Sequence, residues 1–396
     1  HKIFTKVFKK YDDVNSSVQE NVNAIRVVKA YVREDYENSK FRKAIEEVYR
    51  LFVKAESRII LNNPVMFIAV YGCIIALSWF GAKMIVFDEL STGELVSLFS
   101  YVMNIMISLM MISMAFVMVT MSKASADRIA EVINEKSDLS NGDKPVFLVK
   151  DGSIDFNNVN FSYKKDSEEL VLENINIHIK SGETIGIIGG TGSSKSSLVS
   201  LVSRLYDVTD GEVLVGGVNV KQYDIETLRN QVAVVLQKNV LFSGTIKDNL
   251  RWGNKDATDE EMIAACEIAC ADEFIDKFPE KYDTYIEQGG NNVSGGQKQR
   301  LCIARALLKK PKVLILDDST SAVDTATDSK IRAALINEIP KTTKLIIAQR
   351  ISSVSDADKI IVLDDGKING FGTHYELLES NEIYKEVFMS QTKEKR

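Results

Sequence analysis

The chain has 396 residues, with 49 Lys and Arg against 55 Asp and Glu, which gives a formal net charge of −6. Its 45% hydrophobic and 26% charged residues are typical of a globular protein and exclude a disordered chain, a collagen-like chain and a disulfide scaffold. The acidic balance also argues against a dedicated nucleic-acid-binding protein, which usually carries a basic excess.

Residues 1–58 form a charged stretch that is predicted to be helical, and two uncharged stretches follow it, 59–82 and 95–122. Each uncharged stretch is long enough to cross a membrane, which needs about 20 helical residues. A pair of buried core helices is the alternative, but the short loop between the stretches favours a membrane hairpin. That loop is acidic. The outer flanks are basic and contain Lys54, Arg58, Lys123 and Arg128. Both ends of the hairpin are therefore expected to face the cytoplasm.

The second uncharged stretch is rich in methionine. It holds seven of the eleven methionines, at positions 103, 106, 110, 111, 114, 118 and 121. Methionine is flexible and polarizable, so these side chains could line a surface that accepts varied apolar ligands. They could equally be ordinary helix-packing residues, and the sequence leaves both interpretations open.

The pattern changes after the membrane hairpin. Residues 1–130 are assigned to the membrane part, and 131–148 are polar and rich in turn formers, which predicts a linker. In 149–396, short apolar strands alternate with helical segments, for example at 185–188, 232–236 and 313–316. This alternation predicts an α/β domain with a mostly parallel sheet.

A glycine-rich loop follows the apolar strand 185–188 and precedes a helical segment. It consists of Gly189, Gly190, Thr191, Gly192, Ser193, Ser194, Lys195, Ser196 and Ser197. In such P-loops, backbone N–H groups and a helix N-terminus bind phosphate oxygens. Lys195 is expected to reach the β- and γ-phosphates of ATP, and the Ser196 hydroxyl is expected to bind Mg²⁺. Ser194 stands where the usual motif has glycine, which predicts slight backbone strain.

Two further motifs accompany the P-loop. The apolar strand 313–316 ends in the carboxylates Asp317 and Asp318, and Asp317 is expected to hold Mg²⁺ through water. Between the P-loop and this strand, Val-Ser-Gly-Gly-Gln-Lys-Gln-Arg at 293–300 opens a helical segment. A glycine turn before a helix is common, but the full string in this position is not.

Together these motifs resemble those of an ATP-binding cassette (ABC) exporter subunit. Ser294, Gly295, Gly296 and Gln297 resemble the signature that separates ABC proteins from other P-loop ATPases. Other family motifs follow the family order: Tyr163 as the adenine-stacking aromatic, Gln237 as the Q-loop residue, 241–250 as an exporter-type stretch, and Ser321 with Asp324 as the D-loop. The resemblance implies that Gln237 binds Mg²⁺ and takes part in catalysis.

The resemblance also implies a fold and a location. The expected fold is a partial α-helical transmembrane region fused to an α/β P-loop ABC nucleotide-binding domain. Residues 21–36 resemble the intracellular loop that docks on a nucleotide-binding domain. The two spans resemble the last two of six, so four earlier membrane helices are expected to be missing. The expected location is the cell membrane, multi-pass, with the nucleotide-binding domain in the cytoplasm.

The sequence departs from the family pattern at two catalytic positions. Asp318 stands where an active ABC site has Glu, and a shortened carboxylate can cost about 100-fold in rate through misalignment. Gln349 stands at the switch position, which is normally His, and it cannot carry a positive charge. A simple replacement of Glu by Asp with a small penalty is the alternative, but two changes at one site favour degeneracy.

The degenerate positions suggest one half of a heterodimeric exporter. The partners expected from the resemblance are a second ABC half-transporter, ATP with Mg²⁺, membrane lipid and a small lipophilic or peptide substrate, but no nucleic acid. A non-hydrolysing regulatory ATP-binding subunit and a homodimeric lipid or peptide exporter are the alternatives. A soluble ABC protein is disfavoured by the two uncharged stretches, and an importer by their fusion to the nucleotide-binding domain.

Overall fold

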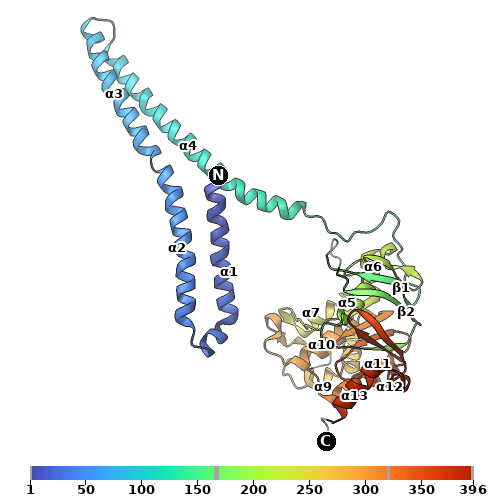
Figure 1. Ribbon diagram of the computed structural model, residues 1–396. Coiled ribbons are helices and arrows are strands. Elements are labelled where there is room, and N and C mark those ends of the chain that lie inside the picture. The colour runs from blue at the N-terminus through green and yellow to red at the C-terminus, as the bar shows by residue number, and fades with distance from the viewer. Residues whose placement is uncertain (1, 165–168, 319–321, 394–396) are drawn as a thin grey trace. The chain divides into compact units, whose positions relative to one another are not determined.

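The structure is a computed structural model that describes residues 2–164, 169–318 and 322–393. The chain divides into two compact units, residues 1–136 and residues 137–396. The first unit is built from long helices, whereas the second combines sheets with shorter helices (Figure 1).

The charged N-terminal stretch forms two antiparallel helices rather than one. Helices α1 (Lys2–Ala30) and α2 (Glu34–Ile59) are joined by a tight turn in which Val32 adopts a φ of 51°. Charged side chains pair across the two helices, as Lys10 does with Glu47 at 2.9 Å. The prediction of helix was therefore right, but the reversal of chain direction was not predicted.

Helix α3 (Asn62–Val86) follows α2 after only Ile60 and Leu61. Pro64 lies in the first turn of α3 and lacks the N–H that would donate to the carbonyl of Ile60. The charged helix and the apolar helix are therefore separate elements, although they are almost continuous along the chain.

Helix α4 (Thr92–Asn134) begins at a capping box. The Ser91 hydroxyl accepts from the N–H of Glu94 at 3.2 Å, and the Glu94 carboxylate accepts from the N–H of Ser91 at 2.8 Å. The helix continues to Asn134, four residues into the segment 131–148 that was predicted as a linker. This extension contains no Gly or Pro that would end the helix earlier.

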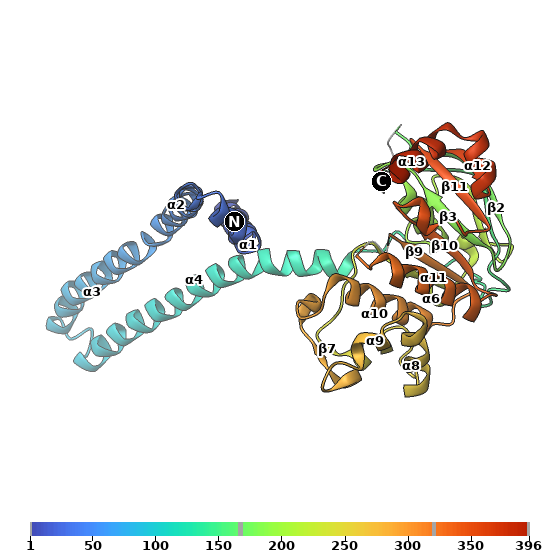
Figure 2. The same ribbon diagram turned by 90° about the horizontal axis from the view of Figure 1, so that it is seen from below.

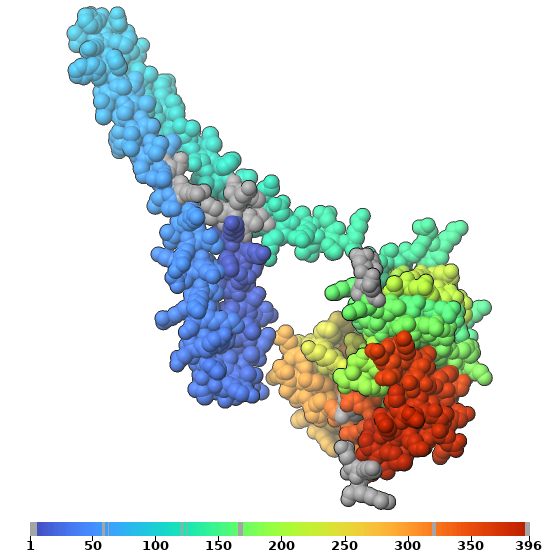
Figure 3. Space-filling view, in the orientation of Figure 1, coloured from blue at the N-terminus to red at the C-terminus, as the bar shows by residue number. Residues whose placement is uncertain are grey.

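Helices α3 and α4 contain segments that are long and apolar enough to cross a membrane, Asn63–Val86 and Thr92–Val119. They lie a few residues from the predicted spans, 59–82 and 95–122. Only 6% and 0% of the residues in their most apolar windows are buried within the chain. Figure 3 shows the pair of helices with its outer surface uncovered. Within the described part of the chain, these helices are therefore not buried core helices.

The second unit contains a six-stranded sheet in the order β12-β11-β3-β10-β9-β6. Its strands are parallel except for the edge strand β12, which confirms the predicted mostly parallel sheet. Four of the strands, β11, β3, β10 and β9, are labelled in Figure 2. A separate antiparallel sheet has the order β2-β1-β4-β5, and β7 pairs with β8. The bounds are β1 (Ile154–Phe161), β2 (Leu172–Ile179), β3 (Thr184–Ile188), β4 (Asp210–Val215), β5 (Val218–Asn219), β6 (Val232–Val235), β7 (Gly244–Thr245), β8 (Tyr285–Ile286), β9 (Val313–Asp317), β10 (Thr343–Ile347), β11 (Lys359–Asp364) and β12 (Lys367–Gly372).

Helices cover the parallel sheet and enclose two apolar cores, one of which also includes the antiparallel sheet. Every residue of β3, β9 and β10 is buried, as expected for parallel strands covered on both faces. The helices are α5 (Lys195–Val202), α6 (Ile225–Gln231), α7 (Ile246–Arg251), α8 (Asp259–Ile268), α9 (Asp272–Ile275), α10 (Gly295–Leu307), α11 (Thr325–Glu338), α12 (His374–Ser380) and α13 (Glu382–Lys393).

The register of the parallel strands positions the candidate site. Ile347 at the end of β10 pairs with Ile187 of β3 on one side and with Asp317 of β9 on the other. The residues that follow these three strands therefore emerge at one edge of the sheet. In open α/β sheets this carboxyl edge is where ligands bind.

Candidate nucleotide-binding site

A cavity of about 540 Å³ lies at the carboxyl edge of the parallel sheet. It is lined by Ile188, Gly189, Gly190, Thr191, Gly192, Ser194, Lys195, Ser196, Ser197, Gln237, Asp317, Asp318, Ile347, Gln349 and Val387. The structure thus brings together the P-loop, the Q-loop residue, both carboxylates and the switch residue. Of the predicted P-loop residues, Ser193 is buried instead, and its hydroxyl donates to the carbonyl of Gly190 at 2.8 Å.

The P-loop glycines serve two different purposes. A Cβ at Gly189 would lie 2.3 Å from the carbonyl oxygen of Leu363, so only glycine fits against β11. A Cβ at Gly190 or Gly192 would meet no atom within 4 Å, so these positions leave open space in front of the backbone. The loop therefore packs tightly on its sheet side and stays accessible on its cavity side, as a phosphate cradle requires.

Ser194 directly precedes helix α5 and has a φ of 71°, in the left-handed region. Glycine adopts this conformation freely, whereas a residue with a Cβ is strained by about 1–2 kcal/mol. The predicted strain at this departure from the usual motif is confirmed. The strained residue starts a helix whose first N–H groups, together with the helix dipole, favour an anion in the cavity.

The polar side chains that line the cavity include those of Lys195, Ser196 and Asp317. The Lys195 ammonium donates to the carbonyls of Gly189 at 2.8 Å and Gly190 at 2.7 Å, and the Ser196 hydroxyl donates to Asp317 at 3.0 Å. Burial lowers the pKa of Lys195, although the two carboxylates nearby oppose this shift. Burial likewise raises the pKa of Asp317. Adjacent hydroxyl and carboxylate oxygens are donors that suit Mg²⁺, so the site fits both a nucleotide phosphate and its metal.

Asp318 is held by two amide side chains. Gln349 donates to its carboxylate at 2.7 Å, and Gln237 is a second side-chain hydrogen-bond partner. Burial raises the pKa of Asp318, and both amide hydrogen bonds oppose this shift. The Asp318 backbone has a φ of 47°, a conformation that Asp adopts more readily than Glu. The two departures from the family pattern are therefore in direct contact with each other.

Tyr163 lies next to the P-loop. Its hydroxyl is 2.9 Å from the hydroxyl of Ser197, and its ring makes edge contacts with Phe161 at 4.8 Å and Tyr206 at 5.0 Å between centroids. The side chain is 54% exposed, which leaves ring surface available for stacking. Tyr206 was not singled out from the sequence, because it belongs to no recognised motif.

The signature segment does not line the cavity in the described part of the chain. Ser294 caps helix α10 through a capping box with Gln297, in hydrogen bonds of 2.8 and 3.3 Å. Gly296 packs against the D-loop, since a Cβ at Gly296 would lie 3.0 Å from the carbonyl oxygen of Ala322. Asp324 caps helix α11 by accepting from the N–H of Thr327 at 3.0 Å. Ser321, the other predicted D-loop residue, lies outside the described residues.

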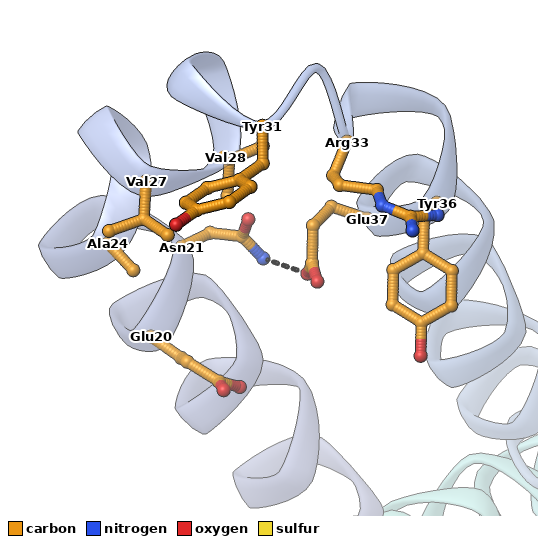
Figure 4. Close-up of a pocket in the computed structure, with 9 residues that line it drawn as sticks. All are labelled: Glu20, Asn21, Ala24, Val27, Val28, Tyr31, Arg33, Tyr36 and Glu37. Atoms are coloured by element: carbon orange, nitrogen blue, oxygen red, sulfur yellow. Dashed lines mark hydrogen bonds between the residues drawn. The ribbon is translucent and has the colours of Figure 1, made fainter.

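The predicted docking segment 21–36 forms the closed end of the α1–α2 hairpin. A cavity of about 470 Å³ opens between the two helices there, and Asn21 donates across it to Glu37 at 2.9 Å (Figure 4). Tyr31 and Val32 at the turn are 75% and 80% exposed. Large apolar side chains at an exposed turn suit a contact with another protein surface.

Residues 1–128 match the ABC transporter transmembrane region, and residues 172–321 match the ABC transporter family. The chain belongs to the ABC transporter family. The uncharacterised ABC transporter ATP-binding protein YfiB of Bacillus subtilis is 38% identical to it over 392 residues, which cover 98% of this chain and 67% of that protein. ABC transporter B family member 4 of Dictyostelium discoideum is 34% identical over 373 residues, which cover 94% and 49% of the two chains.

This ABC transporter chain is also similar to a solved structure of a bacterial Atm1-family ABC exporter with ATP bound. The TM-score is 0.89 at 27% identity, and the match covers 98% of this chain and 70% of that chain. The predicted fold class, a helical transmembrane region fused to an α/β ABC ATP-binding domain, is confirmed. The chain spans 66% and 67% of the length of two Bacillus subtilis relatives, YknU and YfiB.

We expect Ser194→Gly to stabilise the ABC domain by about 0.5–1 kcal/mol, because glycine relieves the left-handed strain but adds freedom to the unfolded chain. Unfolding of the full chain in detergent would be followed by Trp252 fluorescence, with the other tryptophan, Trp79, replaced by Phe. Ser194→Ala is the matched control, since it keeps the Cβ. An equal gain from Ser194→Ala would contradict the backbone explanation.

Proposed function

We propose that this chain is the ATP-binding and permease subunit of an exporter that couples ATP binding and hydrolysis to substrate export across the cytoplasmic membrane. We further propose that it is the degenerate-site half of a heterodimer and that its nucleotide-binding domain lies in the cytoplasm. The observation that carries this proposal is the hydrogen-bonded pair of Asp318 and Gln349 at the two positions where the family pattern has Glu and His.

The contacts of Asp318 support slow hydrolysis at this chain's own site. A carboxylate that activates water must direct a free oxygen toward that water. Here Gln349 and Gln237 both hydrogen-bond to the carboxylate, and the side chain is one methylene shorter than Glu. We assign Gln349 the switch role of donating a hydrogen bond toward the γ-phosphate, but it brings no positive charge there. ATP would be held by the P-loop and Tyr163, with Mg²⁺ at Ser196, Asp317 and Gln237.

The signature segment supports a role in a second, competent site. In the family pattern each nucleotide site joins the Walker motifs of one chain, which are the P-loop and the strand that ends in Asp317 and Asp318, to the signature of the other chain. Ser294 is a well-formed N-cap, so the hydroxyl and the first N–H groups of α10 form a helix start that favours an anion. The signature of this chain would then complete the site carried by the partner.

The alternatives make different predictions for hydrolysis. A non-hydrolysing regulatory subunit would leave no ATPase activity in the complex once the partner's catalytic Glu is replaced by Gln, whereas a degenerate-site half would keep slow turnover. A homodimeric lipid or peptide exporter would hydrolyse ATP without any second kind of chain. Purification from native membranes, followed by identification of the copurifying half-transporter and ATPase assays with and without it, separates these cases.

Lys195→Ala is expected to weaken nucleotide binding at this chain's site while the assembled complex keeps substantial ATPase activity. The reason is that the competent Walker motifs are assigned to the partner. Photolabelling with an azido-ATP probe would measure binding to each chain, and phosphate release would measure turnover. The matched lysine of the partner is the control, because its replacement should abolish turnover. Complete loss of hydrolysis in Lys195→Ala, with assembly intact, would contradict the assignment.

Asp318→Glu alone is not expected to create a full catalytic site, whereas addition of Gln349→His should raise turnover further. Phosphoryl transfer needs an aligned water and a stabilised γ-phosphate together, so each single change leaves one defect in place. Glu at 318 must also accept the left-handed backbone there.

The measurement for this pair is ATPase activity of both single variants and the double variant, with the partner's catalytic Glu replaced by Gln. The two changes should act non-additively, as residues that work as one unit do. Recovery of the unmutated complex's activity by Asp318→Glu alone would show that Gln349 is functionally neutral.

The methionines of α4 support a lipophilic substrate. Val102, Met106, Ser113 and Val117 are the half-buried positions of its central part, at the 4-7-4 spacing of a helix-packing seam. Five other methionines on this helix are exposed, at positions 103, 110, 111, 114 and 118. Most of the methionine side chains are thus not used to pack the hairpin, and we assign them to the substrate pathway.

Replacement of Met110, Met111, Met114 and Met118 together by Leu should raise the KM for transport of an aromatic lipophilic dye about fivefold, because a sulfur–aromatic contact contributes about 1 kcal/mol. Leu is at least as apolar as Met, so insertion in the membrane should not be impaired. Met106→Leu at the packing seam is the control and should leave the KM unaltered. Dye transport into inverted vesicles provides the measurement, and an equal effect of both variants would contradict the assignment.

A further inference from the structure

The C-terminal helix α13 reaches the nucleotide cavity. Val387 from this helix lines the cavity together with the P-loop and Gln349. One helical turn further on, Gln391 contacts the segment that follows β10. The sequence carries no recognised motif in this helix, so neither residue was among those predicted for the site.

Gln391 makes two hydrogen bonds to the backbone that directly follows the switch side chain, one on each side of Arg350. Its amide nitrogen donates to the backbone carbonyl of Gln349 at 2.8 Å, and its amide oxygen accepts from the backbone N–H of Ile351 at 2.9 Å. One planar amide thus holds two backbone groups that lie two residues apart. The side chain of Gln349 is in turn directed to Asp318 at 2.7 Å.

Helix α13, which carries Gln391, is anchored to its neighbours by buried contacts and hydrogen bonds. Tyr384 of α13 is fully buried, and its hydroxyl is 2.7 Å from the ring nitrogen of His374 in α12. The N–H of Tyr384 donates to the side chain of Asn381 at 2.8 Å, and Asn381 donates to the side chain of Asn369 in β12 at 2.7 Å. Gln391 therefore extends from a helix that is anchored to the edge of the parallel sheet.

The amide at position 391 matches both of its backbone partners. Its NH₂ group donates and its carbonyl oxygen accepts within one planar group, and Gln has a longer reach than Asn. A carboxylate could accept from Ile351 but could not donate to the carbonyl of Gln349. An aliphatic side chain could make neither hydrogen bond.

We propose that Gln391 is a positioning residue of the nucleotide site, which fixes the backbone directly after Gln349 and thereby aims the Gln349 side chain. This inference rests on the proposed role of Gln349 at the γ-phosphate, but not on the proposed heterodimer. In this proposal the C-terminal helix α13 contributes to the preference of the site for ATP over ADP.

The test is the ratio of ATP to ADP affinity at this chain's site in the full-length transporter, measured by competition against a labelled azido nucleotide. Gln391→Leu removes both hydrogen bonds and should lower this ratio about tenfold, with ADP affinity unchanged, because the hydrogen bond to the charged γ-phosphate is lost. Gln391→Glu keeps only the acceptor and places a carboxylate oxygen against the carbonyl of Gln349, so it should lower the ratio as well.

Two neighbouring residues provide matched controls. The hydroxyls of Ser390 and Thr392 donate to carbonyls of their own helix, at 2.8 and 2.7 Å. Ser390→Ala and Thr392→Val should therefore leave the ATP to ADP ratio unchanged. Gln349→Ala should lower the ratio as Gln391→Leu does, and the double variant should lose no more than either single variant.

The outcomes separate this inference from the proposed function. The inference is overturned if Gln349→Ala lowers the ratio but Gln391→Leu and Gln391→Glu do not, or if Gln391→Leu weakens ATP and ADP equally. Additive losses in the double variant would also overturn it. If Gln349→Ala leaves the ratio unchanged, the switch role assigned under the proposed function is wrong, and the positioning role of Gln391 falls with it.

Discussion

The parallel pairing of β3, β9 and β10 is the constraint on which the nucleotide site depends. Because Ile187, Asp317 and Ile347 share one register, the chain segments that follow them meet at one edge of the sheet, although more than a hundred residues separate the first from the others. The backbone N–H of Asp318 donates to the carbonyl of Ile347 at 3.1 Å, which continues this pairing one residue beyond the strand. A slip of one residue would move Lys195, Asp317 and Gln349 out of reach of a common ligand.

The sequence predicted those parts of the fold and the site that local patterns determine. The buried parallel strands appear as apolar runs, and the P-loop has a fixed spacing, so both could be found without a structure. The contact of Gln349 with Asp318 was not predicted, since it depends on side-chain directions across two strands. Gln391 carries no local signal at all, because an isolated glutamine in a polar C-terminal helix has the same pattern as a solvent-exposed residue.

The two units place their apolar side chains differently. The ABC domain buries its apolar side chains in two cores between sheets and helices. Helices α3 and α4 instead expose large apolar side chains along almost their whole apolar length, as the transmembrane region of an ABC transporter requires. Their charged neighbours α1 and α2 pair through ion pairs at the surface, which suits water rather than lipid.

The near-continuity of α2 and α3 has a mechanical consequence. Only Ile60 and Leu61 separate the apolar helix from a charged helix of 26 residues, which extends for about 39 Å at 1.5 Å per residue. A rigid arm of this length turns a rotation of about five degrees at its Ile59 end into a displacement of about 3 Å at its Glu34 end. A small angular change where α2 meets α3 would therefore become a movement at the hairpin tip that is large on the scale of a hydrogen bond.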